Sequence, residues 1–370
     1  MTVDVEAKFG VRRRKVLLFV SLSIIFLLFM SLFTVCVVVN RDDDGFFVEG
    51  AIPVRSGLEL KRVVDNAPFG VSVVIALTRD VILTDTLVIL ADKNVTLVSN
   101  SVDKFFKIFG NRGATIWVEK GGYLRIDGVI VTHTVGGEGC GVEVNGGVFV
   151  LSSGEISGNT NIGSVGGVRN GGTFIMLGGA IINNIGYRTS HAGSTKRGGG
   201  VYNSGNFTMM GGEISNNTVH AGGGGVTNSY AGVFDMYGGI ITNNRGGVRV
   251  ESGTFNMYGG EITNNYAYYH GGGVYVEYIG VFNMFGGKIT SNVVVGGSAQ
   301  DPLGGGGVHM SQGVFSMFGG EITGNEAYCG GGVHIENSCV FDRQGGVIVN
   351  NTATSGVGAD FYRYHYTDKW

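Results

Sequence analysis

The feature that most constrains the fold of this chain is an eleven-residue motif, Phe-x-Met-x-Gly-Gly-x-Ile-x-x-Asn, which occurs eight times with few departures. Every copy has Ile seven positions and Asn ten positions after its Phe. Successive copies start 25, 33, 27, 21, 27, 33 and 26 residues apart. A fixed core at a variable spacing is typical of a solenoid, in which rigid turns stack and loops of different length lie between them. The copies begin at Phe149, Phe174, Phe207, Phe234, Phe255, Phe282, Phe315 and Phe341.

The turns of this solenoid are predicted to consist of β-strands. A second motif, a run of glycines followed by Val, precedes most copies. Apolar residues alternate with period two in both motifs, as at Val274 and Val276 and at Phe282 and Met284, which indicates strands. The chain has 68 Gly, and an interior Gly costs a helix about 1 kcal/mol relative to Ala. We therefore expect about three short strands per turn, each stacked in parallel on its equivalent about 4.8 Å away.

Parallel stacking places identical side chains over one another. Columns of Phe, Met and Ile are predicted to fill the interior. The invariant Asn is predicted to lie at an inward bend, take a left-handed conformation and pass amide hydrogen bonds from turn to turn. This ladder is interpreted as structural, with no catalytic role. Its members are Asn159, Asn184, Asn217, Asn244, Asn265, Asn292, Asn325 and Asn351.

The eight motif copies and the Gly-Gly-Gly-Val strands, over about residues 120–360, resemble the right-handed parallel β-helix, the pectate-lyase-like solenoid. In its high glycine content the chain resembles the version of this fold found in adhesin-like surface proteins of bacteria and archaea. The resemblance implies an all-β coil whose first turn is covered by a cap. Ser56 and Glu59 have the spacing of a capping box, which predicts a short helix there. We expect an N-terminal cap with irregular turns at 40–120, the repeats at 121–360 and a C-terminal cap at 361–370.

Residues 16–39 are predicted to form a transmembrane signal anchor. They are 24 residues without a charge, and a helix of that length spans about 36 Å, more than the roughly 30 Å hydrocarbon core of a bilayer. Basic residues at 12–15 precede the segment, so the positive-inside rule places residues 1–15 in the cytoplasm and the rest of the chain outside. The sequence thus predicts a single-pass protein of the cell membrane. A cleaved signal peptide is the alternative.

Two outward-facing columns are the candidate binding residues. One follows the Gly-Gly-Gly-Val valine and contains Tyr202, Arg249, Tyr275, His309 and His334. The other, three residues after the repeat Phe, contains Tyr237, Tyr258, Phe285 and Phe318. Stacked aromatic side chains can stabilise a sheet by themselves, form a platform for sugars or contact another protein, and all three interpretations stay open.

The two histidines of the first column also raise the question of a metal. They occupy equivalent positions one turn apart, near Glu277 and Glu336, so they could bind zinc or titrate as a pair. No tight ligand motif such as HExxH supports a metal site, and we predict neither a metal nor a cofactor.

The sequence predicts binding more strongly than catalysis. No two Asp residues of the Gly-rich region share a column in adjacent turns, so we name no catalytic residue. The net charge of −3 gives no reason to expect nucleic acid as a partner. We expect a surface-displayed protein that binds a glycan or another surface protein. The alternative is a polysaccharide-active lyase or glycoside hydrolase on the same fold.

The two turns of 33 residues suggest where a ligand binds. Their additional residues, Ile185–Arg197 and Val293–Leu303, fall at the same corner of the coil, and inserted loops of solenoids often gather on the binding face. We expect a ligand between these loops, over an open floor formed by Tyr202, Arg249 and Tyr275.

The membrane topology can be tested with protease added outside intact cells. Protease should remove the bulk of the chain and spare the first 15 residues, because only these are predicted to be cytoplasmic. Recovery of the chain as a soluble, secreted protein that starts near Asn40 would show instead that the segment is cleaved. Immunoblots with tags at the two ends distinguish these results.

Overall fold

The computed structural model describes residues 39–42, 45–48, 50–101, 103–187, 198–219, 223–298, 303–336 and 339–364. The chain divides into two units, 1–49 and 50–370. The described part of the first unit is an antiparallel hairpin of β1 (Val39–Asp42) and β2 (Gly45–Val48). The predicted membrane segment lies outside the described residues except for Val39. Within the described parts of the chain, no helix has the length and hydropathy needed to cross a bilayer.

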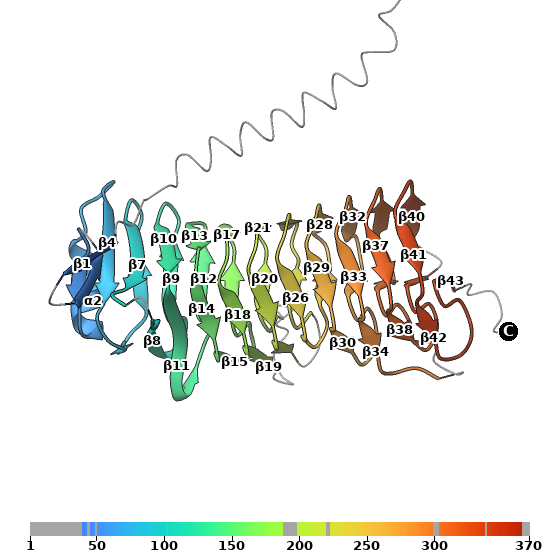
Figure 1. The fold of residues 1–370 in the computed structure, drawn as a ribbon, viewed down its shortest axis with the longest axis horizontal. Helices are drawn as coiled ribbons and strands as arrows, with labels where there is room; N and C mark the ends of the chain where they lie inside the picture. The colour runs from blue at the N-terminus through green and yellow to red at the C-terminus, as the bar shows by residue number, and fades with distance from the viewer. Residues whose placement is uncertain are drawn as a thin grey trace, which may run out of the picture. The chain divides into compact units, whose positions relative to one another are not determined.

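The described part of the second unit is a parallel β-solenoid, which confirms the predicted all-β coil (Figure 1). Each full turn contributes one strand to each of three sheets, and every strand pair in these sheets is parallel. The first sheet, called here the Phe sheet, carries the repeat Phe and Met and has 12 described strands. In spatial order they are β3 (Ile52–Val54), β4 (Ser72–Leu77), β7 (Asn94–Ser99), β10 (Tyr123–Asp127), β13 (Val148–Leu151), β17 (Thr173–Met176), β21 (Asn206–Met209), β25 (Val233–Met236), β28 (Thr254–Met257), β32 (Val281–Met284), β36 (Val314–Met317) and β40 (Val340–Arg343).

The Ile sheet carries the repeat Ile, and the Val sheet follows the glycine runs; each has 11 described strands. The Ile sheet consists of β5 (Val81–Ile82), β8 (Phe106–Arg112), β11 (Val129–Glu138), β14 (Gly154–Ser157), β18 (Ala180–Ile182), β22 (Glu213–Ser215), β26 (Ile240–Thr242), β29 (Glu261–Thr263), β33 (Lys288–Thr290), β37 (Glu321–Thr323) and β41 (Val347–Val349). The Val sheet consists of β6 (Leu87–Ile89), β9 (Ile116–Glu119), β12 (Val142–Asn145), β16 (Val168–Asn170), β20 (Val201–Asn203), β24 (Val226–Asn228), β27 (Val248–Val250), β31 (Val274–Val276), β35 (Val308–Met310), β39 (Val333–Ile335) and β43 (Phe361–Arg363).

Two short sheets lie at the bend between the Ile sheet and the Val sheet. The first has three described strands and the second has four. The first consists of β15 (Thr160–Ile162), β19 (Ile185–Tyr187) and β23 (Thr218–Val219). The second consists of β30 (Tyr266–Ala267), β34 (Val293–Val294), β38 (Glu326–Ala327) and β42 (Thr352–Ala353).

Equivalent side chains stack in register inside the coil. The repeat Phe rings stack on one another, with successive centroids 4.5–5.0 Å apart. Each repeat Met packs beneath the second glycine of the Gly-Gly pair in the next turn. A Cβ on Gly260, for example, would lie 2.6 Å from Cε of Met236, and Gly260 also has φ +81°. Only glycine fits both the left-handed backbone and this close approach.

The invariant Asn column forms a continuous buried ladder. From Asn159 to Asn351, each Nδ2 donates to Oδ1 of the Asn in the next turn at 2.9–3.0 Å. The same Oδ1 also accepts from the backbone N–H of the preceding ladder Asn. The predicted left-handed conformation was misplaced by one residue: it belongs to the preceding position, such as Asn243 and Asn264. The left-handed residue there makes the bend, and the ladder Asn after it points inward.

Both ends of the ladder have a charged or ionisable partner. At the N-terminal end, Nδ1 of His133 lies 2.7 Å from Oδ1 of Asn159. At the C-terminal end, Oδ1 of Asp360 accepts from both the backbone N–H and Nδ2 of Asn351 at 3.0 Å. The ladder amides point head to tail, so their dipoles add as in a helix. The last ladder residue, Asn351, has no further Asn to donate to, and the Asp360 carboxylate takes that place as acceptor.

The predicted capping helix is confirmed as α2 (Gly57–Asn66). Ser56 Oγ accepts from the backbone N–H of Glu59, and the Glu59 carboxylate accepts from the backbone N–H of Arg55. Leu60 and Val64 on this helix are buried in the core. The helix therefore contributes apolar side chains to the first turns of the coil.

The ladder can be tested with Asn265→Ala in the middle of the coil. The change removes the acceptor of the buried Asn244 backbone N–H and one hydrogen bond of the Asn244 side-chain amide, and an unsatisfied buried polar group costs about 1–3 kcal/mol. The free energy of unfolding, from urea titration, should fall by at least that amount. Asn283→Ala is the matched control, because Asn283 makes a similar amide hydrogen bond on the half-buried outer face. Equal melting of the Asn265→Ala variant and the parent would contradict the ladder's role.

Candidate functional site

The shortest turn of the coil leaves a gap in its outer layer. This turn begins at Phe234 and has 21 residues. The two short sheets end on either side of it, with β23 in the turn before and β30 in the turn after. Between Asn244 and the glycines of the short turn there is one residue, Arg245, which makes an isolated bridge to Tyr266. Figure 1 shows the short-sheet strands along one edge of the coil.

A cleft of about 260 Å³ occupies this gap. Its floor comes from the short turn, with Arg245, Val248 and Arg249. One wall is formed by Val219 and Gly223. The other wall comes from the next turn and is rich in aromatic residues: Ala267, Tyr268, Tyr269, His270, Gly271, Tyr275 and Glu277. A missing stretch of chain has therefore produced a polar, aromatic cleft.

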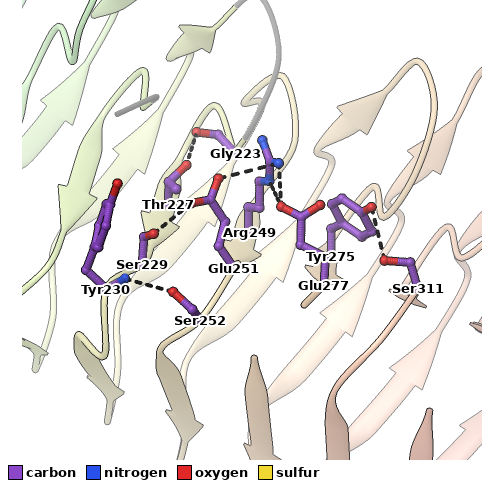
Figure 2. A network of polar contacts seen from close by, with 10 residues as sticks. All are labelled: Gly223, Thr227, Ser229, Tyr230, Arg249, Glu251, Ser252, Tyr275, Glu277 and Ser311. Carbon is purple, nitrogen blue, oxygen red and sulfur yellow. Dashed lines mark hydrogen bonds and ion pairs between the residues drawn. The ribbon is translucent and has the colours of Figure 1, made fainter. Parts of the chain in front are cut away.

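Arg249 organises the floor of the cleft through two carboxylates (Figure 2). Its Nε donates to Oε1 of Glu277 at 2.7 Å, and its guanidinium also contacts Glu251 at 3.4 Å. Ser229 Oγ donates to the other oxygen of Glu251 at 2.7 Å. The side chains of Arg249, Glu251 and Glu277 are only 10–12% exposed. The charge of Arg249 is thus already matched within the protein.

The first predicted column runs along the outer face of the Val sheet. Arg249, Tyr275, His309, His334 and Tyr362 are register partners in successive turns. Ring centroids of Tyr275 and His309 are 5.4 Å apart, and those of His309 and His334 are 4.7 Å apart. The column therefore exists as predicted, and its members pack on one another.

Of the three residues expected to form an open floor, Tyr202, Arg249 and Tyr275, the first is instead buried. Tyr202, His309 and His334 are only 1–3% exposed. The two histidines lie beneath the glycine runs: a Cβ on Gly305 would lie 2.6 Å from Cβ of His309, and one on Gly304 would lie 2.0 Å from Nδ1 of His334. Arg249 and Tyr275 are half-buried and line the cleft.

The buried histidines are held in their neutral form. Burial and the nearby His270 lower the pKa of His309 well below its usual value. Burial, and then His309, lower the pKa of His334 to about 3. Burial raises the pKa of Glu336, whose Oε1 lies 3.2 Å from Nε2 of His309.

No metal site results from this cluster in the described part of the chain. Cys329 Sγ lies 3.4 Å from Nδ1 of His334, and burial raises the pKa of Cys329 to about 11. The thiol is therefore protonated near neutral pH. No group of three or more His, Cys, Asp or Glu among the described residues is arranged to hold a metal ion.

The second predicted column is an exposed aromatic ladder. Tyr237, Tyr258, Phe285 and Phe318 are 37–43% exposed. Their ring centroids are 4.7–5.0 Å apart and their planes are within 8° of parallel. The ring faces therefore cover one another, and the ladder presents ring edges to solvent. A sugar that stacks on an aromatic face has access only to the two ends of this ladder.

The inserted loops cannot be placed beside the cleft. Residues 188–197 and 299–302, which are most of Ile185–Arg197 and part of Val293–Leu303, lie outside the described residues. Sequence reasoning missed Arg245, Tyr268, Tyr269 and His270. The signal that identifies them is the 21-residue spacing, because a turn shorter than both neighbours must leave their outer strands unpaired.

The chain matches no family model, no curated protein and no solved structure. Its class is therefore the one that the fold itself defines, a parallel β-solenoid of three sheets with an amide ladder at one bend.

The neutral histidines predict a loss of stability in mild acid. Between about pH 6.5, the ordinary value, and about 3, the unfolded chain binds a proton at His334 that the folded chain does not. The free energy of unfolding should fall as the pH falls through this window, by about 1.4 kcal/mol per pH unit for each such histidine. His334→Phe should reduce this slope by about one histidine's share, measured by urea unfolding near neutral pH and near pH 5. Identical slopes in the two proteins would contradict the assignment.

Proposed function

We propose that this chain is a membrane-anchored protein that binds a glycan in the cleft of the short turn. In this proposal residues 16–39 hold the chain in the cell membrane and the solenoid lies outside the cell. The coil is of the right-handed, pectate-lyase-like type and acts in the manner of an adhesin. The observation that carries the proposal is the combination of exposed tyrosines and polar groups in one cleft.

Tyr269 is the best-placed residue to stack on a sugar. It is 67% exposed and lines the cleft, as does Tyr268 at 49%. Its ring stacks on no other described aromatic ring, unlike the rings of the Tyr237–Phe318 ladder. Binding sites combine such apolar faces with a few fixed polar groups. Arg245 and Glu277 supply these polar groups here.

The alternative, a lyase or glycoside hydrolase, is less well supported. A hydrolase needs one carboxyl group free to donate a proton and a second free to act as base or nucleophile. The two carboxylates nearest the cleft floor, Glu251 and Glu277, both bind Arg249. Because both carboxylates bind the Arg249 guanidinium, we interpret Glu251 and Glu277 as structural. The cleft is then expected to bind a glycan without cleaving it.

The proposal predicts that Tyr269→Ala weakens glycan binding. Removal of one stacking ring should reduce affinity by up to about tenfold, since such contacts contribute about 0.5–1.5 kcal/mol. The melting temperature should not change, because the side chain is exposed. A glycan array probed with the full chain measures the binding. Tyr278→Ala is the matched control: Tyr278 is 59% exposed and does not line the cleft.

Three outcomes would count against the proposal. Equal binding by Tyr269→Ala and the parent would remove the cleft as the site, and equal loss in Tyr278→Ala would show that the effect is not local. Shortened oligosaccharides after incubation of any bound glycan with the parent chain would favour the enzyme alternative.

A further inference from the structure

Arg245 is held rigidly at the edge of the cleft. Its backbone N–H donates to the carbonyl of Asn217 at 3.0 Å, and its carbonyl accepts from the backbone N–H of Gly224 at 2.8 Å. Asn217 belongs to the buried ladder, so the backbone of Arg245 is tied to that ladder. The guanidinium lies over the ring of Tyr268, with Cζ 4.6 Å from the centroid.

Arg245 differs from Arg249 in its charge environment. No carboxylate among the described residues lies within salt-bridge distance of Arg245, whereas Arg249 contacts both Glu251 and Glu277. Residues 220–222, which lie outside the described part, contain no Asp or Glu. Among the described residues that line the cleft, Arg245 is therefore the arginine whose charge no carboxylate matches.

The geometry around Arg245 favours a planar anion. The guanidinium lies over the Tyr268 ring, and its N–H groups make no hydrogen bond to another described residue. Two parallel N–H donors match the two oxygens of a carboxylate. Stacking on an aromatic ring also limits the conformations of the side chain, so less entropy is lost when the anion binds.

We propose that Arg245 binds the carboxylate of an acidic sugar, such as a uronic acid, within the glycan that the cleft takes. This inference rests on the proposed function and adds the chemical class of the ligand. Tyr269 stacks on a sugar ring, and Arg245 selects for its charge. A neutral glycan of the same length then binds by stacking alone and more weakly.

The test compares oligosaccharides that differ only in charge. The probes are uronic-acid-containing oligosaccharides, such as hyaluronan and alginate tetrasaccharides, and the same compounds after reduction of each carboxylate to an alcohol. The full parent chain should bind each acidic probe about ten- to a hundredfold more tightly than its reduced form, the range expected for a charge-assisted hydrogen-bond pair. Added salt should weaken binding of the acidic probe only.

Arg245→Gln should remove this preference, so that the acidic probe and its reduced form bind with about equal affinity. Lys120→Gln is the matched control, since it removes one positive charge from an exposed position on a distant turn, and it should behave as the parent. Tyr269→Ala should instead weaken binding of both probes. The melting temperature of each variant shows that the coil is intact.

Each other outcome overturns a defined statement. If Arg245→Gln keeps the preference for the acidic probe, Arg245 is not the anion site, although the cleft still binds glycan. If the parent prefers sulfated oligosaccharides over carboxylated ones, the ligand class is wrong. If the parent binds neither probe of any pair, the inference and the proposed function fail together.

Discussion

The buried amide ladder is the interaction on which the rest of the structure depends. Each ladder Asn donates to the next turn and accepts from the turn before, and a one-residue slip would leave several of these groups buried without partners. Such groups cost about 1–3 kcal/mol each. The Phe, Met and Ile columns lie at fixed offsets from the Asn, so the ladder sets their register as well. From Asn159 to Asn351 the ladder thus reinforces the register in which the three sheets pair.

Because the three sheets keep a fixed register, the length of a turn varies mainly at one bend, between the Ile sheet and the Val sheet. Turn length ranges from 21 to 33 residues, and the differences fall mainly between the ladder Asn and the glycine run. Residues added there build the short outer sheets, and residues missing there open the cleft. The rigid ladder thus supports a variable edge, and the short turn exposes Arg245 while Asn217 still holds its backbone in place.

The periodic features of this molecule, its strands and side-chain columns, could be predicted from the sequence. The burial of an outward-facing side chain could not, because it depends on which other segment packs over it. The strand pattern, the columns and α2 follow from spacing and capping residues. The burial of His309 depends on Gly305 crossing over it, which alternation of apolar residues does not reveal. The cleft arises from the absence of chain beside Arg245. The two 33-residue turns predicted a site at the inserted loops, whereas the turn that forms the cleft is the one of 21 residues.

The central claim is that the short turn creates the binding site without affecting the register. Insertion of a copy of residues 266–270 between Arg245 and Gly246 tests it most directly, because these five residues would supply the missing outer strand. The measurement is glycan binding by the full chain, with the melting temperature recorded on the same sample. The account predicts lost binding at an unchanged melting temperature, since the chain fills the cleft and the ladder is untouched. Retained binding, or unfolding of the coil, would contradict it.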